Sequence, residues 1–267
     1  MAGSCAPTCD TGWGTCDGNA ANGCERSLTT VTDCGACDLA CTNPHGGTAC
    51  VASLCAPTCD TGWGTCDANA ANGCERSLTT LTDCSACDVA CNLANASESC
   101  STGTCTITSC SAGFSNCDGN QATGCEVQHS GYSNAPPGVF LGTWDADAAT
   151  GFLCPSQACS LAVTQTGNRG RYLYINAHEG SACCAYVALR VELIVPSGAD
   201  YDLYVSGSPF CDPFGCSSTQ VGNDTITAWA NDDCSAADNS FTLQIEVRYH
   251  SGASCQPWTL NVYRRGC

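Results

Sequence analysis

The spacing of the cysteines is the feature that most constrains the fold of this chain. Eight cysteines recur fifty residues later, and the residues between them repeat almost unchanged. A third copy begins at Cys105 and stops after three further cysteines. A repeat of this period indicates stacked small units that each contact their neighbours. The sequence therefore predicts a tandem, disulfide-knotted, elongated stalk. The repeat cysteines are Cys5, Cys9, Cys16, Cys24, Cys34, Cys37, Cys41, Cys50, Cys55, Cys59, Cys66, Cys74, Cys84, Cys87, Cys91, Cys100, Cys105, Cys110, Cys117 and Cys125.

Cysteine content also indicates the compartment. Cysteine occupies 29 of 267 positions, which is above the content that ordinarily identifies a disulfide scaffold. Disulfides persist in oxidising environments, so we expect an extracellular or cell-surface location. Gly, Asn, Asp, Thr and Ser fill the repeats between the cysteines, and cross-links must therefore replace a hydrophobic core there.

The pairing of the repeat cysteines is a separate prediction. Because the third copy ends after four cysteines, we expect the first four of each copy to form a closed set of two disulfides, and the second four to do the same. The spacing of Cys34, Cys37 and Cys41 could also hold zinc or an iron–sulfur cluster. Disulfides are the favoured interpretation, because an exported chain with so many cysteines oxidises its thiols.

A loop rich in oxygen ligands recurs in every copy. Carboxylate and amide oxygens on a short loop containing glycine are the ligands that calcium prefers. The same residue types are turn formers, and their spacing does not match a twelve-residue EF-hand loop. The turn interpretation is favoured, with calcium as the alternative. The candidate ligands are Asp17, Asn19, Asn22 and Glu25, then Asp67, Asn69, Asn72 and Glu75, then Asp118, Asn120 and Glu126, with Thr123 at the third position.

Net charge restricts the partners. The formal charge is −17 and the chain has no lysine, so a nucleic acid partner is not expected. No apolar stretch approaches the roughly 18 residues that a membrane-spanning helix needs. We expect the partner to be a cell-surface or extracellular matrix component, protein or glycan, or another copy of this chain.

The repeats have a recognisable signature. The run GWGTCDGNAANGCE, followed by TDCGACDLAC, resembles the cysteine-rich repeats of secreted and surface proteins of myxobacterial type over about residues 5–127. The resemblance implies an extracellular address and no particular chemistry.

The composition changes after residue 138. Apolar and polar residues alternate at 187–195 and 241–247, which is typical of half-buried strands. Further strands are expected at 160–165, 171–176, 201–206, 224–230 and 257–263. About seven short antiparallel strands predict a β-sandwich, jelly-roll-like in topology. The expected domains are repeat 1 (1–54), repeat 2 (55–104), partial repeat 3 (105–130), a linker (131–138) and the sandwich (139–267).

The sandwich also resembles a known family. The segments LRVELIVPSGADYDLYV and PWTLNVYR are similar to the bacterial pre-peptidase C-terminal domain, a small β-sandwich appended to secreted enzymes and surface proteins, over about residues 185–264. The resemblance implies an accessory role in folding, anchoring or binding.

The nine cysteines of this second part are an odd number. We expect Cys154 to pair with Cys159 and Cys211 with Cys216, since each pair closes a short loop. We expect the side chains of the adjacent Cys183 and Cys184 to point to opposite faces of a strand and not to pair with each other. Cys267 is the candidate for a free or interchain thiol.

No motif of a nucleophilic, metal-dependent or nucleotide-binding enzyme occurs in the sequence. Asp200 and Asp202 flank Tyr201 on one face of an expected strand, where two carboxylates could bind calcium. A solvated or turn-stabilising role is the favoured interpretation of this pair. We expect no enzyme activity and no required cofactor, with calcium as the only candidate ion.

The leading hypothesis is a non-enzymatic extracellular structural, adhesion or anchoring protein. Its acidic disulfide-rich repeats would present a β-sandwich and could assemble into a larger surface structure or filament. One alternative is a calcium-dependent carbohydrate-binding or protein-binding module. The other is an accessory region of a secreted hydrolase.

Overall fold

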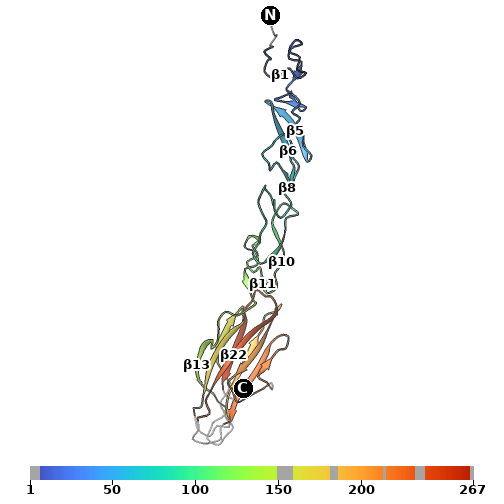
Figure 1. Cartoon of the computed structure of the whole chain (residues 1–267). Coiled ribbons are helices and arrows are strands. Elements are labelled where there is room, and N and C mark those ends of the chain that lie inside the picture. Colours follow the sequence, from blue (N-terminus) through green and yellow to red (C-terminus); the bar gives the residue numbers. More distant parts are fainter. Residues whose placement is uncertain (1–6, 149–158, 181–185, 213–214, 232–237, 265–267) are drawn as a thin grey trace. The chain divides into compact units, whose positions relative to one another are not determined.

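A computed structural model describes residues 7–148, 159–180, 186–212, 215–231 and 238–264 (Figure 1). The regular structure of these residues consists of β-strands and one short 3₁₀ turn, Gln121–Thr123. The chain forms two compact units, Met1–Ser109 and Cys110–Cys267. The predicted all-β, disulfide-rich fold is confirmed.

The first unit consists of short strand pairs. These pairs are β1 (Trp13–Gly14) with β2 (Arg26–Ser27), β3 (Thr29–Thr30) with β4 (Asp33–Cys34), β5 (Gly46–Val51) with β6 (Leu54–Cys59), and β7 (Trp63–Gly64) with β8 (Arg76–Ser77), all antiparallel, together with β9 (Ala96–Ser99) and β10 (Thr106–Cys110). Its buried hydrophobic residues, among those that the structure describes, are all cysteines. Cross-links therefore take the place of a core, as the composition predicts. These cysteines are Cys34, Cys41, Cys74, Cys84, Cys91 and Cys100.

The Asp-Thr-Gly-Trp motif forms a turn that leads into a short strand of each complete copy, β1 or β7. The backbone N–H of Trp13 donates to the carbonyl of Asp10 at 3.0 Å, which closes a β-turn. Gly12 occupies the third position of this turn with a φ of 86°, in the left-handed region that glycine adopts without steric cost. Gly62 repeats the geometry with a φ of 83°.

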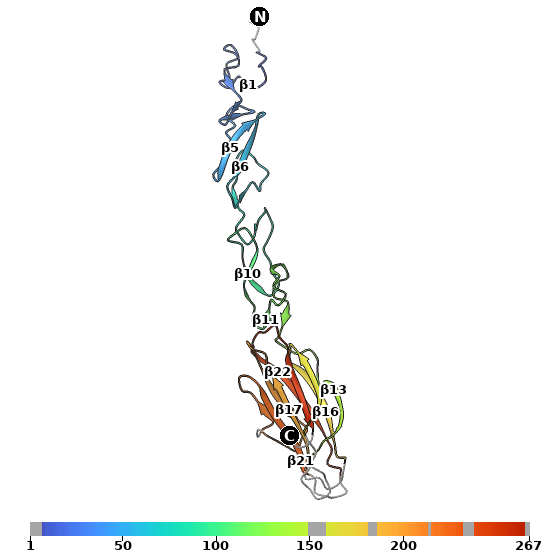
Figure 2. The same ribbon diagram turned by 180° about the vertical axis from the view of Figure 1, so that it is seen from behind.

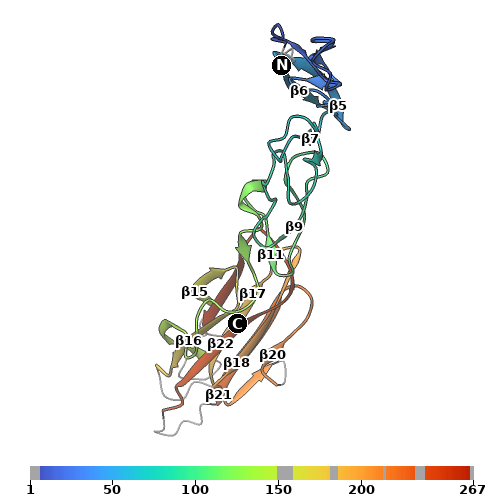
Figure 3. The same cartoon turned by 45° about the horizontal axis from the view of Figure 1, so that its top comes forward.

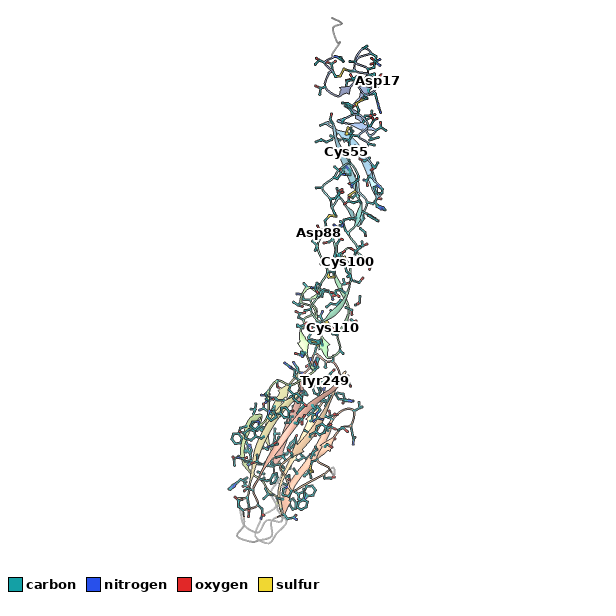
Figure 4. All side chains as sticks on the ribbon, viewed as in Figure 1. Asp17, Cys55, Asp88, Cys100, Cys110 and Tyr249 are labelled. Atoms are coloured by element: carbon teal, nitrogen blue, oxygen red, sulfur yellow. A yellow bond between two sulfur atoms is a disulfide. The ribbon has the colours of Figure 1, made fainter. Side chains whose placement is uncertain are left out.

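One arginine per copy fixes the following turn. Arg26 contacts the carboxylates of Asp33 at 2.6 Å and Asp38 at 2.9 Å. Arg76 repeats these contacts with Asp83 and with Asp88, which is labelled in Figure 4. The same charged contacts therefore recur in both complete copies.

The second unit begins with the partial third copy, in which β11 (Phe114–Ser115) pairs with β12 (Val127–Gln128). Two sheets follow (Figure 2). The five-stranded sheet has the order β13 (Val139–Asp145), β16 (Arg171–His178), β22 (Phe241–Gly252), β18 (Ala199–Ser206), β20 (Ser217–Ser218). The other has the order β15 (Ser160–Gly167), β23 (Trp258–Arg264), β17 (Tyr186–Ile194), β21 (Asp224–Asn231), β19 (Phe210–Asp212), and β14 (Asp147–Ala148) also pairs with β17.

The strand order is that of a jelly roll. Strands β15 to β18 and β20 to β23 alternate between the sheets, as β15-β23-β17-β21 and β16-β22-β18-β20, and every neighbouring pair is antiparallel. Many of these strands can be followed in Figure 3. The predicted antiparallel β-sandwich is confirmed. One pair departs from it, because β13 runs parallel to β16.

The core lies between the two sheets. The side chains of Leu189, Val191, Leu243, Ile245 and Trp258 are buried to 1% exposure or less within one apolar cluster. Each contributes about 1.5–3 kcal/mol by leaving water. The seven predicted strands correspond to β15, β16, β17, β18, β21, β22 and β23. Strands β13, β14, β19 and β20 were not predicted. Strands β14, β19 and β20 have two or three residues, which are too few to show a period, and the burial of side chains along β13 does not alternate.

Residues 131–138 do not form a linker. The side-chain amide of Asn134 donates to the carbonyl of Tyr172 at 2.7 Å and accepts from its N–H at 2.9 Å, as a neighbouring strand would. The ring of Tyr132 stacks on that of Tyr172, with 4.7 Å between centroids. These contacts place the segment within the second unit, so the boundary lies at 109/110 rather than at the predicted 131–138.

Candidate functional site

The repeat cysteines are cross-linked in an interlocked pattern. Cys9–Cys24 lies within the first four cysteines, but Cys16–Cys37 joins the first four to the second four. Cys34–Cys50 follows, and Cys41–Cys55 joins one copy to the next. The prediction of closed sets of four is therefore wrong. The second copy repeats the pattern with Cys59–Cys74, Cys66–Cys87, Cys84–Cys100 and Cys91–Cys105. Cys55 and Cys100 are labelled in Figure 4.

The third copy is completed by a cysteine of the jelly roll. Cys110–Cys125 repeats the first pairing, and Cys117 bonds to Cys255, which lies between β22 and β23. Cys117 corresponds to Cys16, whose partner Cys37 has no equivalent in the shortened copy. Truncation after four cysteines therefore did not indicate a closed set.

This bond also changes the count of cysteines in the second part. With Cys255 bonded to the third copy, eight of the nine remain, so parity no longer requires a free thiol there. The predicted Cys211–Cys216 disulfide is confirmed, and Cys159 is also disulfide-bonded. Cys5, Cys154, Cys183, Cys184, Cys234 and Cys267 lie outside the described residues, so the Cys154–Cys159 pairing and the Cys267 thiol stay predictions.

The cysteines whose spacing could have held a metal form disulfides. The sulfur atoms of Cys34, Cys41 and Cys55 lie within 4.8 Å of one another. Each belongs to a disulfide, Cys34–Cys50 or Cys41–Cys55, and Cys37 of the predicted spacing is bonded to Cys16. The thiolates that zinc or iron requires are therefore not present in this arrangement.

The oxygen-rich loops hold their own turns. Asp17 accepts from the Asn19 N–H at 2.8 Å and from the Asn22 side-chain amide at 2.6 Å. Glu25 accepts from the N–H groups of Cys16 and Asp17 at 2.6 and 3.0 Å. The bond from Asn19 and then that from Asn22 lower the pKa of Asp17. These oxygens already serve the turn, as the favoured interpretation expects, and calcium stays a prediction for the loops.

The other copies repeat this arrangement. Asp67 accepts hydrogen bonds from the Asn72 side-chain amide and from the Asn69 N–H. Both bonds lower the pKa of Asp67, and the bond from Asn72 has the larger effect. In the third copy the hydroxyl of Thr123 takes the place of the asparagine amide and donates to Asp118 at 3.1 Å. The corresponding glutamates, Glu75 and Glu126, accept from the backbone as Glu25 does.

Asp200 and Asp202 lie on the outer face of β18, as predicted, but they are not solvated. Their exposed fractions are 8% and 7%, so the interpretation as a solvated strand is wrong. His250 of β22 joins them, with its Nδ1 3.2 Å from Asp200 Oδ2. One donor atom from each of the three residues lies within 4.8 Å of the others. His250 was missed because strand pairing, rather than sequence proximity, brings it there.

A β-bulge gives His250 this position. Tyr201 lies opposite Tyr249, and Asp200 lies opposite Ser251, so His250 is the additional residue between the two pairs. A bulge of this kind sets two residues against one and redirects a side chain. Tyr201 points into the core between the two aspartates. The arrangement therefore places two carboxylates and one imidazole at one point of the outer face.

A second histidine, His129, joins the third copy to the jelly roll. Its fully buried ring lies 3.1 Å from the Tyr201 hydroxyl through Nδ1 and accepts from the Ser254 N–H at 3.4 Å through Nε2. The Tyr201 hydroxyl in turn donates to the Asn168 carbonyl at 2.6 Å. Burial lowers the pKa of His129. The ring is therefore a neutral structural connector.

An aromatic surface lies on the outer face of the six-stranded sheet. Phe210 of β19 and Trp229 of β21 are cross-strand neighbours whose rings stack 6.2 Å apart, 21° from parallel. Phe210 is 46% exposed, and both rings line a shallow groove together with Pro209 and Thr227. Exposed stacked rings of this kind offer apolar area for contact with a partner.

No family model, curated protein or solved structure matches this chain. Within the part of the chain that the structure describes, no helix has the length and apolar character needed to cross a membrane. The functional argument therefore rests on the residues and their geometry.

Proposed function

We propose that this protein is a non-enzymatic extracellular structural protein that anchors or adheres under tension, with the jelly roll as the part presented to a partner. The observation that carries the proposal is the order of the disulfides along the chain. They provide a covalent path from the first copy to Cys255 that avoids most of the polypeptide.

The path can be followed through the cysteines. It passes from Cys16 to Cys37, along the chain to Cys41, and across to Cys55. The second copy repeats these steps through Cys66–Cys87 and Cys91–Cys105, and Cys117–Cys255 completes the path. The segments off the path are 17–36, 42–54, 67–86, 92–104 and 118–254.

This order has a mechanical consequence. Tension applied before Cys16 and after Cys255 is carried by covalent bonds and short backbone segments, rather than by hydrogen bonds between strands. Nearly the whole jelly roll lies within the loop that Cys117–Cys255 closes. The strands within this loop are thereby protected from extension, and their outer faces stay available for binding. Strand β23 follows Cys255 and lies on the loaded part of the chain. A protein that holds an extracellular attachment requires this combination.

Single-molecule pulling tests the proposal, with handles before Cys9 and after Arg264 under non-reducing conditions. In the parent protein the segment 118–254 should not extend. In a variant with Cys117→Ser and Cys255→Ser, unfolding of the jelly roll should release the segment between these two positions. Their sequence separation is 138, which corresponds to roughly 450–500 Å at full extension.

The matched control is a variant with Cys211→Ser and Cys216→Ser, whose disulfide spans 5 residues and lies off the path. This control should extend as the parent does. A release of the same length in the parent as in the Cys117/Cys255 variant would show that tension passes through the sandwich, and the proposal would then be wrong.

A further inference from the structure

The cluster of Asp200, Asp202 and His250 contains an unpartnered charge. Asp200 Oδ1 is buried and has no hydrogen-bond partner, and Asp200 as a whole is 8% exposed. Among the residues that the structure describes, its other oxygen contacts the exposed imidazole of His250. A buried carboxylate oxygen without a donor or a cation is costly. A cation bound at this carboxylate would offset its buried charge.

The neighbouring basic residue does not neutralise the cluster. Arg248 lies opposite Asp202 in the strand register, but its guanidinium contacts Glu246 at 2.9 Å and lies over the ring of Tyr204. Within the described part of the chain, the side chain of Asp202 accepts a hydrogen bond from the Tyr204 hydroxyl at 3.4 Å. The charge of Asp202 also raises the pKa of the buried Asp224, after the larger effect of burial itself. This end of β18 therefore carries an excess of negative charge.

The distances suit one ion. Two donors that bind a tetrahedral zinc ion, each at about 2.0–2.1 Å, are roughly 3.3 Å apart. Asp200 Oδ2 and His250 Nδ1 are 3.2 Å apart, and a donor of Asp202 lies within 4.8 Å of both residues. An imidazole nitrogen among the donors favours zinc over calcium or magnesium, which prefer oxygen ligands alone.

We propose that Asp200, Asp202 and His250 form a binding site for a divalent transition-metal ion of the zinc type, on the outer face of the five-stranded sheet. The site supplies three protein ligands. The side chain of His250 is 63% exposed, so the fourth position faces solvent and can accept a water molecule or a donor from a partner. This arrangement matches a three-ligand open zinc site.

The test is calorimetric titration of the oxidised full chain with Zn²⁺ alone, combined with thermal unfolding. The parent should bind one ion at this site and unfold at a higher temperature when zinc is present. His250→Gln and Asp202→Asn should raise the Kd of this site roughly tenfold or more. The control Asp212→Asn, an exposed carboxylate on β19, should bind zinc as the parent does.

Two further measurements keep the outcome decisive. His250→Ala replaces an exposed side chain and should fold even if the aspartate variants do not, and it should lose the zinc-dependent rise in unfolding temperature. Calcium should bind this site more weakly than zinc. Absence of zinc binding by the parent, equal binding by the His250 variants, or a preference for calcium at this site would each overturn the proposal.

Discussion

At the scale of single residues, His129 shows how burial converts a titratable side chain into a structural one. The Ser254 N–H donates to Nε2, so the ring must keep a lone pair there and carries its one proton on Nδ1, next to the Tyr201 hydroxyl. A second proton would remove this acceptor and place a charge in a fully buried position. The neutral ring is therefore required for the contact.

The pH dependence of stability follows from this burial. The pKa of His129 is lowered in the folded protein, so below about pH 6.5 the unfolded chain binds a proton that the folded chain does not. The contribution of the neutral His129 to the free energy of unfolding should be fully present above that pH. It should fall as the pH decreases, by at most about 1.4 kcal/mol per pH unit. Urea unfolding between pH 5 and 7.5 measures it. His129→Gln should remove this component, whereas His178→Gln, at the exposed end of β16, should retain it. Equal slopes in the parent and in His129→Gln would contradict the assignment.

At the scale of elements, the segment 131–138 and the strand β16 behave as one unit. Asn134 forms both of its hydrogen bonds with the backbone of Tyr172, so an irregular segment satisfies a strand edge that would otherwise be unpaired at this residue. A sequence with proline and glycine in this segment suggests a linker. Side-chain pairing of this kind leaves no periodic signal by which it could be recognised.

Removing the Asn134 amide tests this role. Asn134→Ala should lower the free energy of unfolding of the second unit by about 1–3 kcal/mol, because two hydrogen bonds of about 0.5–1.5 kcal/mol each are lost. Denaturant unfolding measures the change. Gln244→Ala, an exposed amide on the outer face of β22, should change stability by less than about 0.5 kcal/mol. Similar values for the two variants would mean that the segment is only loosely attached.

The elements with a strong local pattern were predictable from the sequence. Alternation around Leu189 and Leu243 identified β17 and β22, and the cysteine repeat identified the copies. The pairing of Cys117 with Cys255 and the approach of His250 to Asp200 were not predictable. The first depends on where the fold places the segment between β22 and β23, and the second depends on strand register. Cysteine spacing gives positions without partners.

At the scale of the whole molecule, the two units differ in what holds them together. Buried cysteines replace an apolar core in the first unit, whereas the second unit has a continuous apolar core between two sheets. Reduction of the disulfides removes the main stabilising contacts of the first unit and leaves the apolar core of the second unit in place.

Hydrogen exchange under reducing conditions measures this difference. Amide protons of residues 9–105 should exchange rapidly once the disulfides are reduced. Those of β17 and β22 should stay protected, because their hydrogen bonds belong to a packed core. Under non-reducing conditions both units should be protected. Equal loss of protection in both units after reduction would contradict the proposed difference in their stabilisation.

The disulfide that joins neighbouring copies affects how such a gene can change. Cys41 bonds to Cys55, and Cys91 bonds to Cys105, both with a sequence separation of 14. If recombination between the near-identical copies deleted residues 55–104, Cys41 would meet Cys105 at the same separation, and every other pair would be kept. An insertion of one copy would preserve the pairs in the same way. The array can therefore gain or lose whole copies during evolution without leaving an unmatched thiol.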